Sequence, residues 1–177
     1  AVDFKIVKSY GLFVVIGVIL GTIFASSLKT KPLVLFFCVV VYILSFYLIF
    51  LKEKSTKIKI TMKFFPKLLL GFISGFLSAP MGIGGAIMNV PILKFFGYTI
   101  NKAIGSAAAI GFLIALTGAI GFLITGTYLN SNLPMSLGFI NIPAFLTFVP
   151  ITMFMARVGA KTVHKLNKEK ISIYFGF

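Results

Sequence analysis

The residues of this chain best suited to chemistry lie in a short segment that is rich in glycine and proline. An otherwise apolar run is interrupted there by Pro80, Gly82, Gly84 and Gly85. These residues leave backbone polar groups that lipid cannot satisfy, so such a break is tolerated only where it is buried in protein or lines a wet cavity. A helix that begins just after the break points unpaired N–H groups and the positive end of its dipole into that cavity. These groups can bind an anion, and glycine allows it to approach the backbone closely.

We expect the substrate-binding residues to be those of the break and three polar side chains in or beside the apolar runs. A hydroxyl or amide group there can bind a substrate oxygen, although it can equally bond to a backbone carbonyl or a neighbouring helix. Gly71 and Gly75 have the four-residue spacing of helix contacts, and we assign them to packing alone. The candidate substrate-binding residues are Ser78, Pro80, Gly82, Gly84, Gly85, Ala86, Asn89 and Ser106.

Catalysis is not expected, because the ionisable residues are badly placed for it. Asp3, Glu53 and Glu169 all lie outside the apolar runs, so no carboxylate is available within the membrane for a proton relay or acid-pair catalysis. The one histidine, His164, and the one cysteine, Cys38, are far apart in the sequence, which gives neither a metal cluster nor a nucleophile beside a base. The sequence therefore predicts that the chain is not an enzyme and uses no cofactor or metal.

The composition places the chain in a membrane. Of its 177 residues, 59% are hydrophobic and only 11% are charged, and the mean hydropathy is +1.07. A soluble domain cannot hide that much apolar surface, and a disordered chain lacks it. The net charge of +14 comes from basic residues between the apolar runs. That placement fits the excess of lysine in cytoplasmic loops and the attraction of anionic lipids, so we expect the lipid bilayer as a partner and no nucleic acid.

The apolar runs predict an all-α polytopic membrane protein. Four of them have the length of a membrane-crossing helix, since about 20 residues at 1.5 Å each span the hydrocarbon core of a bilayer. They are Tyr10–Leu28, Pro32–Leu51, Ala103–Thr125 and Ser136–Ala156. A fifth run, Leu68–Phe96, contains the break at Pro80 and the glycines that follow it.

The charges between these runs predict a re-entrant helix hairpin at 68–96. The linker at 52–67 carries six lysines against one glutamate, which places it in the cytoplasm, whereas 126–134 is uncharged and is assigned to the outside. Because 103–125 crosses once between them, the chain must be back on the cytoplasmic side after Phe96. The run at 68–96 therefore enters and leaves on the same face, as two half-helices that meet at the break. The alternative is one long broken helix that crosses once.

The sequence also shows a faint internal repeat. Three residue pairs are separated by the same interval, and two copies with opposite orientation would form an inverted repeat, which is common in secondary transporters. A chance match in a chain rich in leucine, phenylalanine and glycine is the alternative. The pairs are Gly21 with Gly159, Leu28 with Leu166, and Phe37 with Phe175.

This repeat defines the expected domain organisation. Residues 1–51 would be the last two helices of a first repeat, and 52–67 a basic linker. Residues 68–177 would be the second repeat, which ends in a truncated helix at 171–177. On the same register, the first copy of the glycine-rich break precedes Ala1, so we expect the chain to be a portion, or a decayed version, of a longer protein.

An ordered series of short motifs runs through most of the chain. It begins with Ser78-Ala-Pro-Met-Gly82-Ile-Gly84-Gly85-Ala86 and Val90-Pro91-Ile-Leu93, and continues through the segments 102–108, 116–121, 134–144 and 159–166. This series resembles the sulfite exporter TauE/SafE family of membrane transporters, in which the first motif is a serine followed by Gly-x-Gly-Gly-Gly and the second is Val-Pro-x-Leu. Here Ala86 replaces the third glycine. The resemblance implies a transporter with two homologous halves that moves sulfite, sulfonates or related small organic anions.

The residues and the resemblance together predict an inverted-repeat transporter, an exporter of small anions in the cell inner membrane. The anion would be held near mid-membrane, and access to it would alternate as the two repeats move. A second copy of the chain, or a separate first half-repeat, would be the protein partner. The alternatives are a passive anion channel and a membrane scaffold or assembly subunit that does not transport.

Overall fold

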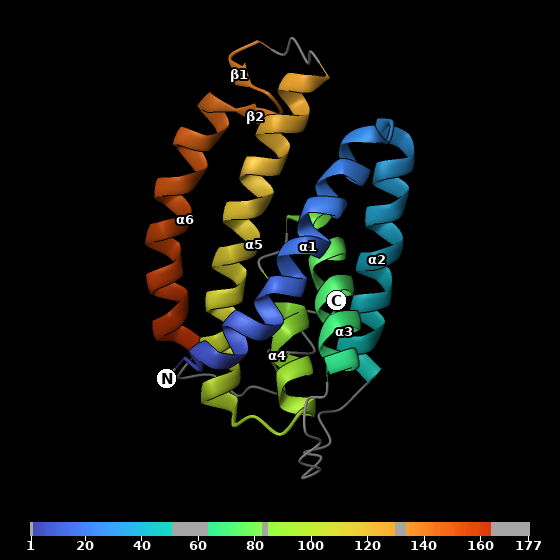
Figure 1. Ribbon diagram of the computed structural model, residues 1–177. Coiled ribbons are helices and arrows are strands. Elements are labelled where there is room, and N and C mark those ends of the chain that lie inside the picture. Colours follow the sequence, from blue (N-terminus) through green and yellow to red (C-terminus); the bar gives the residue numbers. More distant parts are fainter. Residues whose placement is uncertain (1, 51–63, 83–84, 130–133, 164–177) are drawn as a thin grey trace.

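The computed structural model describes residues 2–50, 64–82, 85–129 and 134–163. Over these residues the chain forms six helices and one two-stranded hairpin (Figure 1). The helices are α1 (Phe4–Ser27), α2 (Thr30–Phe50), α3 (Phe64–Met81), α4 (Ala86–Phe95), α5 (Ile100–Tyr128) and α6 (Ile142–Val163), and the strands are β1 (Ser136–Leu137) and β2 (Ile140–Asn141). The prediction of an all-α polytopic membrane protein is confirmed.

Two helices, α1 and α3, begin four or more residues earlier than the apolar runs predict. The side chain of Asp3 accepts hydrogen bonds from the N–H groups of Lys5 and Ile6, so it caps α1 and starts the helix ahead of the apolar run. α3 begins at Phe64, inside the segment predicted as a linker at 52–67. Pro66 does not prevent this, because proline is tolerated in the first turn of a helix. The rest of that linker, 52–63, lies outside the described residues.

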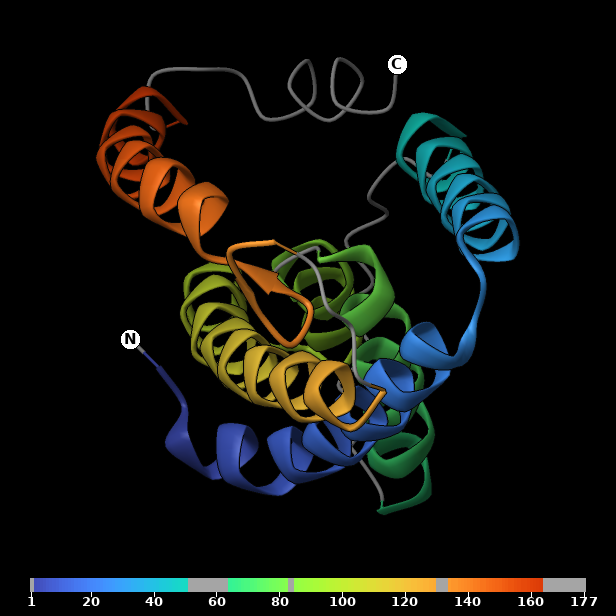
Figure 2. The same cartoon turned by 90° about the horizontal axis from the view of Figure 1, so that it is seen from above.

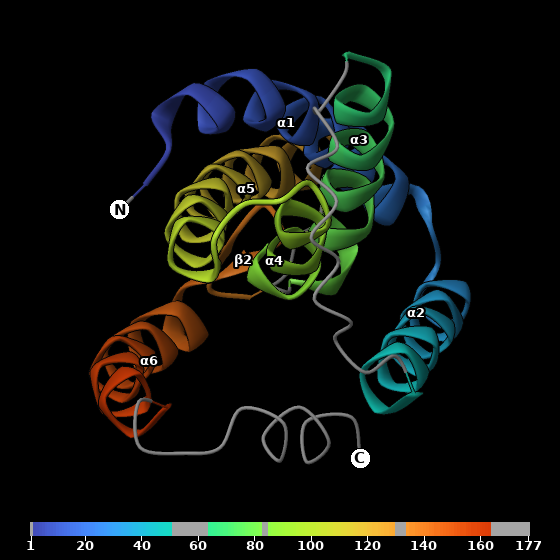
Figure 3. The ribbon, with the colours of Figure 1, turned by 90° about the horizontal axis from the view of Figure 1, so that it is seen from below.

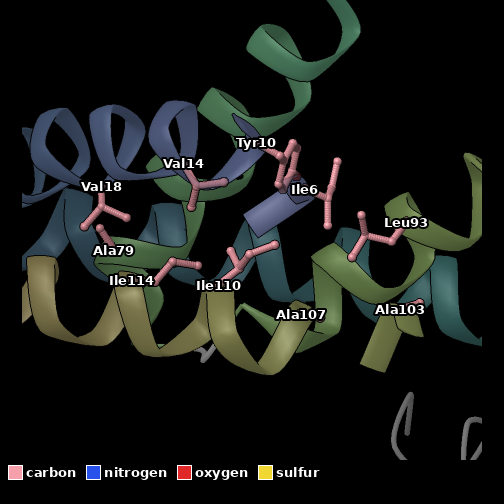
Figure 4. Close-up of a cluster of buried hydrophobic side chains, with 10 residues drawn as sticks. All are labelled: Ile6, Tyr10, Val14, Val18, Ala79, Leu93, Ala103, Ala107, Ile110 and Ile114. Carbon is pink, nitrogen blue, oxygen red and sulfur yellow. The ribbon is translucent and has the colours of Figure 1, made fainter. Parts of the chain in front are cut away.

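Helices α1, α3, α4 and α5 pack together and form the core. Apolar side chains on α1 recur every four residues and face a row of small and branched side chains on α5, with contributions from α3 and α4 (Figure 4). The clustered residues are Ile6, Tyr10, Val14, Val18, Ala79, Leu93, Ala103, Ala107, Ile110 and Ile114. Two members of this core lie beside the glycine-rich break: Ala79 precedes Pro80 directly, and the Ile114 side chain lies against Gly85.

Glycine sets the distance between α1 and α3. A Cβ atom on Gly75 would overlap the carbonyl of Val14, and one on Gly17 would overlap the carbonyl of Phe72. A Cβ on Gly71 would press against the side chains of α1. The prediction that Gly71 and Gly75 serve helix packing is therefore confirmed, because larger residues there would force the two backbones apart.

The chain reverses direction between α3 and α4, as the loop charges predict. α3 and α4 run in opposite directions, and the start of α3 and the end of α4 lie at the same end of the molecule (Figure 1). The arms are unequal, since α3 has 18 residues and α4 has 10, or about 27 and 15 Å of helix. This reversal contradicts a single broken helix that runs on in one direction, and the re-entrant course of the hairpin in the membrane stays a prediction.

Helices α2 and α6 stand apart from the central group of four helices (Figures 2 and 3). Of the described residues, four helices are long and apolar enough to cross a membrane, namely α1, α3, most of α5 and most of α6. In α6, none of the apolar stretch Ile142–Gly159 is buried within the chain. As an inverted repeat requires, α1 and α6 run in opposite directions (Figure 1). The equivalence of these two helices stays a prediction.

The prediction of a membrane span beginning at Ser136 is wrong by six residues. Ser136 pairs with Asn141 in an antiparallel hairpin that turns at Gly138, whose φ of +57° is readily adopted by glycine. α6 then begins at Ile142, where the Asn141 side chain accepts a hydrogen bond from the N–H of Ala144 at 2.9 Å. The predicted truncated helix at 171–177 lies outside the described residues.

Candidate functional site

The break between α3 and α4 is formed by residues with special backbone requirements. Pro80 lies in the last turn of α3, which ends at Met81. Gly82 follows with a φ of +61°, is exposed, and has open space where a Cβ would be. Glycine is favoured there because other residues rarely adopt that conformation. Of the predicted site residues, Gly84 lies outside the described residues.

Helix α4 begins without a side-chain cap. Its N-cap residue is Gly85, and no side chain of the described residues accepts a hydrogen bond as a cap there. Its N-terminal backbone hydrogen bond runs from the N–H of Asn89 to the carbonyl of Gly85, at 2.9 Å. The N–H groups that precede it, beginning with that of Ala86, have no partner within the helix itself and lie at the positive end of its dipole.

Asn89 connects three helices through its side-chain oxygen. The residue is fully buried. Its Oδ1 accepts a hydrogen bond from the Tyr10 hydroxyl on α1 and another from the Ser74 hydroxyl on α3, each at 2.8 Å. The Tyr10 hydroxyl also lies 3.4 Å from the carbonyl oxygen of Leu70. We call Tyr10, Ser74 and Asn89 the amide cluster.

The nitrogen of the same amide group has no partner. Within the described part of the chain, Asn89 Nδ2 is the buried side-chain polar atom without a hydrogen bond. It lies against the start of α4, because a Cβ on Gly85 would contact it together with the end of the Ile114 side chain. An unpartnered buried donor costs about 1–3 kcal/mol. The first turn of α4 thus combines backbone N–H groups with a side-chain N–H₂ that requires an acceptor.

The other predicted polar residues are distributed between two places. Ser78 is buried on α3, one helical turn after Ser74 and on the same face of the helix. Ser106 is buried on α5, but its hydroxyl accepts a hydrogen bond from the N–H of Asp3 at 3.0 Å. It lies eight residues before Ile114, or about 12 Å along the helix. The structure therefore groups Asn89 with Gly85 and assigns Ser106 to the start of α1.

The start of α1 is a self-contained polar region. Asp3 accepts from two backbone N–H groups and donates its own N–H to Ser106. Tyr98, in the connection between α4 and α5, is nearby. Burial, and then the negative charge of Asp3, raise the pKa of the Tyr98 phenol, so this group stays neutral.

The buried polar side chains of the described residues are all uncharged. They are Thr22, Ser74, Ser78, Asn89 and Ser106, with the hydroxyl of Tyr10. In the same residues no group of three or more histidine, cysteine or acidic side chains could hold a metal ion. Tyr10 is absent from the sequence-based set, because a tyrosine in an apolar run counts as a hydrophobic residue; its phenol oxygen is the one signal that could have singled it out.

Comparisons with known proteins agree with this architecture. A model of the family described as sulfite exporter TauE/SafE matches residues 1–177. A Haemophilus influenzae protein named "Probable membrane transporter protein" is 32% identical over 133 residues, which are 75% of this chain and 50% of the relative. A Methanocaldococcus jannaschii protein of similar name is 30% identical over 109 residues, 61% of this chain and 39% of the relative. No solved structure matches.

The chain thus spans half or less of the length of these curated relatives. The family and both relatives are named for transport and not for catalysis, which confirms the prediction that the chain is not an enzyme. The ordered motifs, the helices long enough to span a membrane and the match along the entire sequence lead to one assignment. This chain is a multi-pass membrane protein of the sulfite exporter TauE/SafE family.

Proposed function

We propose that this chain forms part of the substrate pathway of a membrane transporter that exports small oxyanions, such as sulfite or sulfonates, across the cell inner membrane. One observation carries the proposal: the uncapped first turn of α4 and the unpartnered Asn89 amide nitrogen lie together in the buried part of the chain. Membership of the family supports transport, and the description of that family supports a sulfite-like substrate.

The chemistry of this place favours an anion over a cation. The groups that lack partners are N–H donors, and the helix dipole adds positive potential. A bound cation would instead need carboxylate or carbonyl oxygens, and the buried polar side chains of the described residues carry no charge. An oxyanion with several acceptor oxygens can engage the backbone of Gly85–Ala86 and Asn89 Nδ2 together. The Ser78 hydroxyl, on the facing helix of the hairpin, is the proposed further contact.

Access to the site would depend on the break itself. Gly82 is exposed and leaves open space at its Cβ position, whereas Gly85 is packed against Ile114 of α5. A shift of the short arm α4 against α5 would therefore expose the first turn of α4 to a different side. Such a movement is the local form of the alternating access that inverted-repeat transporters use.

The scaffold alternative loses its main support in the fold. Its docking faces would be the small-residue stripes of α1 and α3, but Gly17 and Gly75 are already used in packing these two helices against each other. The passive-channel alternative makes a different kinetic prediction. A carrier shows saturation and counterflow, whereas a channel does not.

The test is sulfite efflux from proteoliposomes that contain the full-length protein. Gly85→Ala adds a methyl group that overlaps the Asn89 amide and Ile114, so we expect at least a tenfold lower efflux rate. Gly118→Ala is the matched control, since a Cβ there meets Val18 at an ordinary 3.8 Å, and its rate should stay within twofold of wild type. Wild-type efflux from a correctly inserted Gly85→Ala protein would contradict the site, and the absence of saturable sulfite or sulfonate efflux in the wild type would contradict the function.

A further inference from the structure

We infer that one face of α6 is the docking surface for a second helix hairpin, which is related to the hairpin of α3 and α4 by the inverted repeat and comes from outside residues 1–177. The inference goes beyond the proposed function, because it concerns how the two repeats assemble and holds for any substrate. It starts from α1, the helix that the repeat register pairs with α6.

Helix α1 buries one face against α3 and α5. A Cβ on Gly21 would lie 2.7 Å from the carbonyl oxygen of Phe76, so α1 and α3 are in close backbone contact there. Ile16 and Ile19, on the other side of α1, are exposed. The buried face includes Tyr10, Val14, Gly17 and Gly21.

The interval that separates Gly21 from Gly159 carries this buried face onto α6. The corresponding residues, which we call the bare face, are Phe148, Thr152, Met155 and Gly159. All four are exposed within this chain, and nothing lies within 4 Å of a Cβ on Gly159. Of two helices that the repeat makes equivalent, one is therefore buried along this face and the other is uncovered.

The positive charge of α6 lies away from the bare face. Arg157 follows Phe148 by nine residues, or about two and a half turns, so it lies on the opposite side of the helix. On the repeat register Arg157 corresponds to Ile19, which is exposed on α1. The bare face itself is uncharged and includes a glycine, which allows close contact between helices in a membrane.

The occupant that we assign to the bare face is an arm like α3 from the other repeat. Because α6 runs opposite to α1, this arm would run opposite to α3 (Figure 1). Half of the Haemophilus influenzae relative lies outside the match, which is room for a hairpin with arms of 18 and 10 residues. A second copy of this chain cannot supply the arm, since its α3 is already packed against its own α1 through Gly71 and Gly75.

Phe148 and Phe154 form a matched pair for the test. They are 67% and 66% exposed within this chain, but only Phe148 belongs to the bare face. Each is replaced in turn by the photo-cross-linking residue p-benzoylphenylalanine in the full-length protein, which is irradiated in its membrane and digested for mass spectrometry. We expect position 148 to cross-link to a peptide outside residues 1–177 with at least ten times the yield of position 154. Thr152 is the second probe position if the first variant does not insert.

The glycine of the bare face gives a second readout with a definite sign. Gly159→Leu should lower the melting temperature of the full-length protein in detergent by about 5 °C, because the larger side chain would push the docked arm away. On a surface that faces only lipid or detergent, the same change would leave the melting temperature equal or raise it, since leucine favours a helix more than glycine does. Val158→Leu, next to the bare face but not part of it, is the control and should leave the melting temperature unchanged.

Three results would overturn the inference. Cross-links from position 148 to lipid alone would mean that the bare face lies in the bilayer. Cross-links only within residues 1–177, or between two copies of the chain, would assign the face to another occupant. An equal or higher melting temperature in Gly159→Leu would show that no helix approaches there. None of these results concerns sulfite efflux, so the proposed function is tested separately.

Discussion

The first turns of α1 and α4 each have a fully buried polar residue beside them, Ser106 and Asn89, but they differ in how many of their hydrogen bonds are made. At α1, Asp3 accepts from two backbone N–H groups and donates its own N–H to Ser106. At α4, the N-cap residue is Gly85, no described side chain caps the helix, and Asn89 Nδ2 has no partner. Both Ser106 and Asn89 are polar and fully buried. Burial of a polar residue therefore does not by itself mark a ligand site.

What distinguishes the two places is the unfinished hydrogen bonding at α4. Most buried polar groups in folded proteins have a partner, so one without a partner requires an explanation. At the start of α1 the protein supplies acceptors for the N–H groups of Asp3, Lys5 and Ile6. At the start of α4 it supplies donors and withholds the acceptor, which is the arrangement that a bound oxyanion would complete.

The largest effect should come from reversing the chemistry of the amide at α4. Asn89→Asp replaces the donor with an acceptor and adds a negative charge that repels an anion, so we expect sulfite efflux to fall at least 100-fold, or about 2.7 kcal/mol. Asn141→Asp is the matched control, because Asn141 is exposed and uses only its side-chain oxygen, which aspartate retains. Efflux above a tenth of the wild-type rate in a folded Asn89→Asp protein would remove Asn89 from the site.

The next effect is stabilisation by the anion itself. Methanesulfonate at one hundred times its dissociation constant should stabilise the wild-type protein by about 2.7 kcal/mol, because it binds only the folded state. The expected measurement is a higher melting temperature in detergent. Asn89→Asp should show no such rise, whereas Asp3→Ala should keep it. An equal rise in all three proteins would mean that the anion acts elsewhere.

A smaller effect is expected at α1, where the polar groups hold the helix and not a ligand. Asp3→Ala removes the cap and should lower the free energy of unfolding by about 1 kcal/mol. Sulfite efflux should remain within twofold of wild type once equal amounts of folded protein are compared. Thermal unfolding measures the loss of stability, and the proteoliposome assay measures efflux. A loss of efflux without a loss of stability would extend the site to this end of α1.

Ser106→Ala should have the smallest effect. It removes one acceptor for the N–H of Asp3, and because Asp3 is only partly buried, water can replace the hydroxyl. We expect a loss of about 0.5 kcal/mol in the free energy of unfolding. Efflux should again stay within twofold of wild type. A loss of transport without a loss of stability would return Ser106 to the substrate-binding set that the sequence predicts.

The sequence by itself determines the class of protein, the reversal of the chain and the place of the break. These features depend on the length of apolar runs, on lysines between them and on clustered glycine and proline, all of which are local. The span predicted from Ser136 is wrong because a short hairpin with Gly138 at its turn occupies its start. The early start of α1 follows from a local cap at Asp3 that the apolar pattern does not contain.

Only the tertiary structure decided which polar residues act together. Tyr10 and Asn89 are 79 residues apart, and Ser106 and Asp3 are 103 apart. No local pattern determines such pairs, because they depend on how three or four helices pack. The sequence names Asn89 and Ser106 as equal candidates. The fold gives Ser106 a partner at the start of α1 and leaves the Asn89 amide nitrogen without one, since the hydroxyls of Tyr10 and Ser74 contact only the amide oxygen.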